Sequence, residues 1–345
     1  MAPETVAAFA PGRVNLIGEH TDYNLGLALP FAIEEGITAR ARRLDRGARV
    51  LAFAEDLDER DEFDPRDPAP AEGWRAFARG VVAELARAGI APSAVELRFG
   101  GGVRTGAGLS SSAALEVALA LALLALARAE LDRVSVARLC SRVENEWVGA
   151  NTGLLDQLAS LYGAPDTALR IDFAELSVDP VPLELHGWRL AALDSGERHV
   201  HASSGYNERR AECARACELL GVTSLREADP QQAAALPEPL AARARHVLSE
   251  NARVESAVRA LRAGDLPSLA HLLDVAHASL RDDYEISTAA VERTRSRLLD
   301  SGAAGARLIG GGFGGSVLGM FPPDREPPED AHEVRPGPGA HLLPA

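Results

Sequence analysis

The strongest constraint on the fold is a run of alanine and leucine that follows a stretch rich in glycine and serine. Val117–Ala127 holds no charged residue, and Glu116 and Arg128 flank it. The run is too short to cross a bilayer, and a helix that is apolar on every side must be buried. The chain must therefore place its other elements around this helix.

The remaining hydrophobic periodicity predicts helices and strands that are interspersed along the chain. Helical spacing occurs at Trp74–Ala88, Val134–Trp147, Leu154–Leu161, Tyr206–Leu220, Gln231–Ala263, Leu266–Leu280 and Val291–Leu299, and strand patterns occur at Ile37–Arg43, Arg49–Phe53, Val95–Phe99 and Ser316–Phe321. The regular alternation of a doubly wound sheet is absent, which favours an α+β fold. A chain of 345 residues suggests two domains, at roughly 150 residues for each domain.

The charge balance and the residue types exclude several classes of function. The net charge is −14, so nucleic-acid backbones and anionic membranes are repelled. Arginine supplies all 36 of the lysine and arginine residues, which excludes a P-loop lysine and a Schiff-base lysine. Met1–Phe9 holds neither a basic segment nor a long apolar one, so we expect a cytoplasmic protein without a signal peptide. The three cysteines imply no disulfide framework.

A candidate phosphate site precedes the apolar helix. Gly100–Gly108 follows a predicted strand, and Ser110–Ser112 opens the helix. Glycine lets the backbone approach a ligand closely, and the free N–H groups at a helix start favour negative charge. Serine hydroxyls can cap the helix, bind phosphate oxygens or ligate Mg²⁺. A flexible loop with an ordinary serine cap is the alternative interpretation.

A second polar segment, Gly12–Asn24, lies between two apolar runs and is expected to form a loop. Glu19, His20 and Asp22 can accept hydrogen bonds from a polyol, and Arg13 supplies a fixed cation. A fan of such groups is typical of a sugar site. A solvated hairpin loop explains the same residues equally well.

Other polar residues are ambiguous when they are taken alone. Glu144 near a helix end and Asp156 near a helix start are commonly no more than caps or partners of the helix dipole. His199 and His201 alternate on a predicted strand, where structural roles are favoured over a metal site because no third ligand is near. Gly310–Ser316 is a second glycine-rich loop that can close over a ligand.

Three of these segments together resemble the motifs of the GHMP kinase superfamily. Gly12–Asn24 resembles its galactokinase signature, Gly106–Ala113 resembles its ATP loop, and Gly310–Ser316 resembles its third motif. Shorter matches lie between them, and the resemblance runs in collinear order from about Ala8 to Met320. It implies the two-domain α+β GHMP kinase fold, with the active site in the cleft between residues 1–178 and residues 179–345.

The resemblance also implies an activity, namely transfer of the γ-phosphate of ATP to the anomeric hydroxyl of galactose, the entry step of galactose catabolism in the Leloir pathway. A kinase for a related sugar such as N-acetylgalactosamine or arabinose is one alternative. A non-catalytic sensor of sugar and ATP is another, although intact Arg13 and Asp156 argue against it. The expected partners are therefore small molecules, with Mg²⁺ as the accompanying metal ion.

Individual roles carry over to matching positions. Asp156 is expected to face the anomeric hydroxyl, as a general base or as an orienting charge, with Arg13 beside it. Sugar contacts are matched to Glu19, His20, Asp22, Gly153 and Tyr206; ATP contacts to Gly106, Ala107, Gly108, Leu109, Ser110, Ser111, Ser112 and Ala113; and Mg²⁺ ligands to Ser112 and Glu144.

The sequence departs from the family pattern at three places. Leu25 stands where glycine is usual, and Ser316 replaces a usual cysteine, which we expect to be neutral. Residues 322–334 are too short for the helix that the family normally places before its last strand. The tail from Pro322 to Ala345 is rich in proline and glycine, so we expect it to be the least ordered part of the second domain. Ala340–Leu343 is nevertheless expected to pair as an edge strand.

Overall fold

The computed structural model describes residues 5–91, 94–103, 108–150, 152–198 and 202–344. Its first part is a sheet with the strand order β13-β1-β3-β6-β4-β5. These strands are β1 (Thr5–Asn15), β3 (Pro30–Arg43), β4 (Val50–Ala54), β5 (Glu59–Phe63), β6 (Val95–Gly101) and β13 (His341–Leu342). All neighbours in it are antiparallel except β4 and β6, which are parallel. The mixture of strand directions and helices confirms the α+β prediction.

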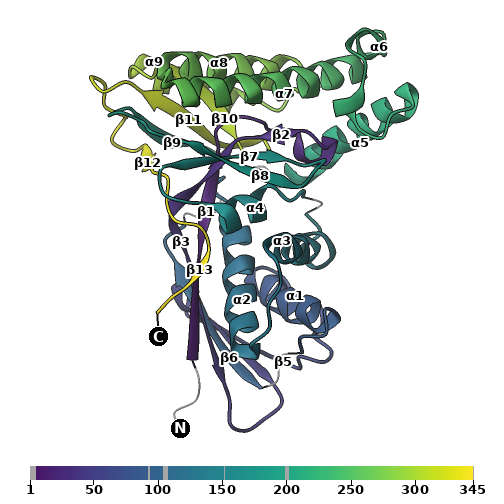
Figure 1. Cartoon of the computed structure of the whole chain (residues 1–345), viewed down its shortest axis with the longest axis vertical. Coiled ribbons are helices and arrows are strands. Elements are labelled where there is room, and N and C mark those ends of the chain that lie inside the picture. The colour runs from purple at the N-terminus through teal and green to yellow at the C-terminus, as the bar shows by residue number, and fades with distance from the viewer. Residues whose placement is uncertain (1–4, 92–93, 104–107, 151, 199–201, 345) are drawn as a thin grey trace.

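Helices cover one face of this sheet (Figure 1). They are α1 (Trp74–Arg87), α2 (Ser111–Ala127), α3 (Arg133–Arg142) and α4 (Leu155–Tyr162). The predicted apolar helix is α2, and it is buried along most of its length, including Glu116. The expected helix Val134–Trp147 is wrong in one respect, because α3 gives way to a π-helical turn, η3, at Val143–Val148. Such turns are rare and frequently mark functional sites.

The second part of the chain builds a smaller sheet in the order β10-β11-β9-β12, beneath a layer of helices (Figure 1). Its strands are β9 (Arg189–Arg198), β10 (Gly305–Ile309), β11 (Gly314–Phe321) and β12 (His332–Val334). The helices of this part are α5 (Ala202–Leu220), α6 (Pro230–Ala234), α7 (Leu240–Ala263), α8 (Leu266–Asp282) and α9 (Ala289–Asp300). A third sheet, formed by β2 (Leu27–Ala28), β7 (Thr167–Asp172) and β8 (Ser177–Pro182), lies between the two parts.

The boundary between the two parts is packed rather than open. One buried cluster includes Val14 and Leu16 from β1 and its end, Val254 from α7 and Leu318 from β11. Elements from both halves of the sequence therefore share a hydrophobic core directly behind the loop that follows β1. Among the described residues, no helix is long and apolar enough to cross a membrane.

Two sequence predictions about loops are changed by the structure. The polar loop does not begin at Gly12, because β1 continues to Asn15 with a register shift between Pro11 and Arg13. A β-bulge of this kind redirects side chains. The tail, in contrast, contains the expected edge strand: β13 pairs with β1 through Leu342 and His341. The tail also supplies β12, which pairs with β9.

Candidate active site

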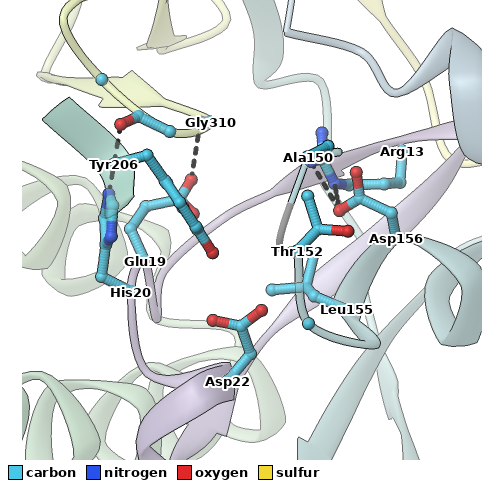
Figure 2. Close-up of a pocket in the computed structure, with 13 residues that line it drawn as sticks. Arg13, Glu19, His20, Asp22, Ala150, Thr152, Leu155, Asp156, Tyr206 and Gly310 are labelled. Carbon is cyan, nitrogen blue, oxygen red and sulfur yellow. Dashed lines mark hydrogen bonds and ion pairs between the residues drawn. The ribbon is translucent and has the colours of Figure 1, made fainter. Parts of the chain in front are cut away.

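A pocket of about 330 Å³ lies where the loop after β1, the start of α4 and the glycine loop after β10 meet. It is lined by Arg13, Glu19, His20, Asp22, Ala150, Thr152, Gly153, Leu155, Asp156, Tyr206, Gly310, Gly311 and Gly312. Figure 2 shows Glu19, His20 and Tyr206 on one side, and Arg13 and Asp156 on the other. We call the first group together with Asp22 the loop wall, and the second group together with Ser110, Ser112 and Glu144 the helix wall.

The helix wall is built on an ion pair between Arg13 and Asp156. Arg13 Nε and Nη2 lie 2.8 and 2.6 Å from Asp156 Oδ1. Arg13 Nη1 donates to the carbonyl of Gly108 at 2.6 Å, which ties the pair to the glycine loop. The Asp156 side chain keeps 24% of its surface exposed, so the carboxylate is neutralised by its neighbour and still open to the pocket.

Two of the three serines at the start of α2 have different partners. Ser110 has a left-handed backbone with φ 57°, and its hydroxyl donates to Asp156 Oδ2. Ser112 Oγ donates to Glu144 Oε1 at 2.8 Å. Thr152 and Gln157 also donate to Glu144, the latter at 3.1 Å. One serine therefore orients the carboxylate of the helix wall, and another holds the acid of the π-helical turn.

Sequence reasoning missed Thr152 and Glu116 as parts of this cluster. Glu116 is fully buried in α2, and burial together with the nearby Glu144 raises its pKa well above the ordinary value. Burial also raises the pKa of Glu144. The available signal was a single acid inside an otherwise apolar helix; for Thr152 there was none.

Glu19 and His20 of the loop wall are buried, and both contact the glycine loop in the second half of the chain. Glu19 Oε1 accepts from Gly310 N at 2.9 Å, and its Oε2 accepts from Asn15 Nδ2 at 3.0 Å. His20 contacts the Tyr23 hydroxyl through Nδ1 at 2.8 Å and the Gly311 carbonyl through Nε2 at 3.3 Å. Burial lowers the pKa of His20 to about 3, so the imidazole is neutral near pH 7.

Asp22 lies at the start of a short 3₁₀ helix, η1 (Asp22–Asn24). Burial, with the charges of Asp156 and Glu19 as smaller causes, raises its pKa to about 6. Gly153 lies directly against it, because a Cβ at Gly153 would collide with the Asp22 carboxylate. Any side chain at position 153 would displace the Asp22 carboxylate, so glycine lets the two segments approach with Asp22 in its present position.

The structure brings together most of the expected site residues. Arg13, Asp156, Glu19, His20, Asp22, Gly153 and Tyr206 all line the one pocket, and Ser112 contacts Glu144. Leu109 and Ala113 are buried, so only their backbone is left for a ligand. Gly106 and Ala107, as well as His199 and His201, lie outside the described residues.

A second pocket, of about 770 Å³, opens beside the start of α2. Its lining includes Ser111 and Ser112 together with three aromatic side chains, Trp74, Phe77 and Phe99. Aromatic faces beside the N-terminus of a helix, where free N–H groups favour negative charge, are suited to a ligand that carries both a flat ring and phosphates.

Two departures from the family pattern have local consequences. Leu25 adopts a left-handed backbone at φ 53°, a conformation that costs a side-chain residue about 1–2 kcal/mol. Ser316 is buried, and its hydroxyl has no hydrogen-bond partner among the described residues. A buried unpaired hydroxyl costs about 1–3 kcal/mol, so the serine is expected to reduce stability, in contrast to the neutral effect expected from the sequence.

Fold and site define a GHMP kinase. The GHMP kinase N-terminal and C-terminal domain families match residues 76–164 and 257–338, and the galactokinase galactose-binding signature matches residues 2–43. The chain is 43% identical over 341 residues to the galactokinase of Mycobacterium tuberculosis, across 93% of this chain and 90% of that protein. It is 42% identical over 326 residues to the Streptomyces coelicolor galactokinase, across 92% and 84% of the two chains. The chain belongs to the galactokinase family.

Solved structures agree with this assignment. The crystal structure of Lactococcus lactis galactokinase complexed with galactose is 31% identical and covers 99% of this chain and 95% of its own, with a TM-score of 0.91. The Methanococcus jannaschii mevalonate kinase, at 16% identity, covers 96% of this chain and 98% of its own with a TM-score of 0.70, and its likeness concerns the fold alone.

Proposed function

We propose that the protein transfers the γ-phosphate of ATP to the anomeric hydroxyl of D-galactose and releases galactose 1-phosphate and ADP. The observation that carries this proposal is the placement of Arg13 and Asp156 opposite Glu19 and His20 across one pocket, with Asp22 between the two groups. The loop wall offers hydrogen-bonding groups to a sugar. The helix wall offers one exposed carboxylate to the hydroxyl that reacts.

Asp156 accepts the proton of the attacking hydroxyl in this proposal. Its Oδ1 is occupied by Arg13, and its Oδ2 by the Ser110 hydroxyl. Two N–H groups of Arg13 fill the acceptor sites of Oδ1, whereas Oδ2 keeps a further lone pair, and the side chain is partly exposed to the pocket. Phosphoryl transfer needs positioning and charge stabilisation more than covalent chemistry, so an orienting role for the same carboxylate is compatible with the geometry.

The aromatic pocket beside α2 is the proposed nucleotide site. Trp74, Phe77 and Phe99 would contact the base. Ser111, the first residue of α2, also lines that pocket. The N–H groups at the start of α2 and the backbone of residues 106–113 would then receive the phosphates. This arrangement directs the γ-phosphate toward the sugar pocket, because Ser110 bonds to Asp156.

Ser112 and Glu144 are the proposed Mg²⁺ ligands. Both supply oxygen, which Mg²⁺ prefers, and their oxygens lie 2.8 Å apart. The described residues contain no group of three histidine, cysteine or acidic side chains that would hold a metal ion. Mg²⁺ usually takes one or two carboxylates together with phosphates and water, so a two-residue site fits an ion that arrives with ATP. When bound, the ion would neutralise charge on the phosphates.

A coupled ADP-release assay across a panel of sugars tests the proposal. We expect turnover with galactose above that with N-acetylgalactosamine, arabinose and glucose, and a product phosphorylated at the anomeric carbon by ³¹P NMR. Higher kcat/KM for another sugar would favour the related-sugar alternative. Sugar and ATP binding without any ADP release would favour the sensor.

A further inference from the structure

Arg307 is a charged side chain behind the sugar pocket that the mechanism above does not use. It lies on β10, and its side chain is completely buried. Nη1 donates to the carbonyl of Leu16 at 2.5 Å, at the point where β1 leads into the sugar loop. Nη2 lies 3.3 Å from Glu19 Oε1. Arg307 does not line the pocket, whereas Glu19 does.

A buried guanidinium needs a compensating charge, and Glu19 is the available one. The other carboxylate nearby, Glu250 on α7, accepts from Arg253 Nε at 2.6 Å and from Gly18 N at 2.8 Å. Glu250 therefore has its own cation. The surrounding imidazoles of His20, His246 and His277 all have a lowered pKa because of burial, so they add no positive charge near pH 7.

Glu19 in turn depends on Arg307 for its counter-charge. The other arginine near Glu19 is Arg13, whose guanidinium is already bonded to Asp156 and to the Gly108 carbonyl. Glu19 Oε1 is held from one stretch of chain, by Arg307 and by the N–H of Gly310 just after β10. The segment at β10 therefore positions Oε1 of Glu19, while Asn15 at the end of β1 holds Oε2.

We propose that Arg307 is a positioning residue for galactose binding, which holds the Glu19 carboxylate against the pocket from behind without contacting the sugar. The inference rests on the proposed function, because it takes galactose as the ligand of the loop wall. It separates Arg307 from Arg13: the first serves sugar binding, and the second serves the reacting carboxylate.

The test is a double-mutant cycle with Arg307→Met and Glu19→Gln, read by galactose titration calorimetry and by steady-state kinetics. Loss of a charged contact to Glu19 should weaken galactose binding about tenfold or more, and it should leave the KM for ATP within about twofold. In the Glu19→Gln background the same Arg307 change should add less than about twofold, because its target is gone. A similar loss of galactose affinity in both backgrounds would overturn the proposal, as would equal changes for both substrates.

Two controls separate an effect on galactose binding from an effect on folding. Arg307→Met leaves Glu19 buried without its cation, so its melting temperature should fall, and the double variant should recover part of that loss. If the single variant does not fold, Arg307→Lys replaces it in the cycle, since it keeps the charge but cannot contact the Leu16 carbonyl and Glu19 with the two ends of one guanidinium. The same two criteria then decide.

Arg295→Met is the matched control. Like Arg307, Arg295 is an arginine that ties β10 to a neighbouring element. It donates to the Ala306 carbonyl of β10 at 2.9 Å and pairs with Asp274 at 2.7 Å. This variant should lower the melting temperature and leave galactose affinity unchanged; reduced affinity here would mean that any weakening of β10 disturbs the pocket, and the positioning role would fail. Wild-type protein that does not bind or phosphorylate galactose would instead refute the proposed function.

Discussion

The two walls of the pocket handle charge in opposite ways. On the helix wall, Asp156 is partly exposed and lies beside an arginine at 2.6 Å. On the loop wall, Glu19 is buried and Asp22 is half-buried, and desolvation raises the pKa of both. A partly exposed carboxylate that has its own cation can contact a substrate hydroxyl directly. A buried one costs stability until a ligand supplies hydrogen bonds. Substitutions on the helix wall should therefore act on turnover, and those on the loop wall on sugar affinity and stability.

Substitution of Asp156 should have the largest effect, and it tests the difference between the two walls most directly. Asp156→Ala should lower kcat by about 10²–10⁴-fold or more, because the proton acceptor and its positioning effect are both lost. The fold should remain, since the side chain lies at the pocket surface. Steady-state kinetics and circular dichroism measure the two effects.

The control for this prediction is Asp61→Asn. Asp61 and Arg79 form a two-pronged pair with both bonds at 2.8 Å, so the contact resembles that of Asp156 but lies away from the pocket. The control should cost stability and keep kcat. Near wild-type kcat in Asp156→Ala would remove the catalytic role from the helix wall.

Ser112→Ala sharpens the assignment within the helix wall. The Mg²⁺ concentration for half-maximal turnover should rise at least about tenfold, since the hydroxyl is both a proposed ligand and a donor to Glu144. A Mg²⁺ titration at saturating galactose measures it. Ser141→Ala is the control, because its hydroxyl contacts Gly153 and Asn145 instead. An unchanged Mg²⁺ requirement in Ser112→Ala would limit Ser112 to orienting Glu144.

Asp22→Asn tests the loop wall through two quantities, the affinity for sugar and the stability of the fold. The KM for galactose should rise about tenfold to a hundredfold, the cost of a lost charged acceptor, with little change in the KM for ATP. Equal increases for both substrates would make the loop merely structural.

The same variant should also alter stability in a pH-dependent way. The pKa of Asp22 is raised from 3.8 to about 6 in the folded protein, so ionisation of Asp22 opposes folding. Stability is lost as the pH rises through about 6, by about 3 kcal/mol for a rise of this size. Asp22→Asn should therefore melt higher than wild type at pH 8, and this advantage should vanish near pH 4. A constant difference across that range would refute the burial argument.

Local pattern was enough to predict the elements that carry the walls. The strand–glycine–serine–helix order around Ser110–Ser112 indicated an anion site because its physics is local: glycine freedom, free N–H groups and a helix dipole. The buried helix α2 was predictable for the same kind of reason. In contrast, Asp156 and Glu144 were ambiguous from the residues alone, and only the resemblance to a known family separated them from ordinary caps.

The contacts that the sequence could not predict join distant segments. Nothing near Arg307 or Glu19 indicates that they meet, because the pairing depends on how β10 packs behind the end of β1. The bulge between Pro11 and Arg13 and the π-helical turn at Val143–Val148 also depend on tertiary packing. Arg13 lies at the bulge and Glu144 lies in the π-helical turn. Periodicity therefore predicted the elements that hold these residues, but not the directions of their side chains.

The smallest expected effect on turnover concerns the C-terminal tail, which contacts α4, the helix that carries Asp156. Removal of residues 336–345 deletes β13 and three further contacts: Gly337 N to Ala32 O, Ala340 N to Ser160 O, and Leu343 N to Ala7 O, each at 2.8 Å. At about 1 kcal/mol net for each bond, the three bonds alone account for about 3 kcal/mol and several degrees of melting temperature, and loss of the β13 pairing adds to this. Ser160 lies on α4, the helix that carries Asp156.

Turnover should nevertheless survive this truncation, because Arg13 and Ser110 hold Asp156 at the opposite end of α4 from the tail. We expect kcat within about twofold of wild type, measured well below the melting temperature so that the comparison concerns folded protein alone. A tenfold fall in kcat with an unchanged melting temperature would contradict this, since it would show that the tail orients the helix wall. The division between the two walls would then have to include the C-terminus as a third part of the site.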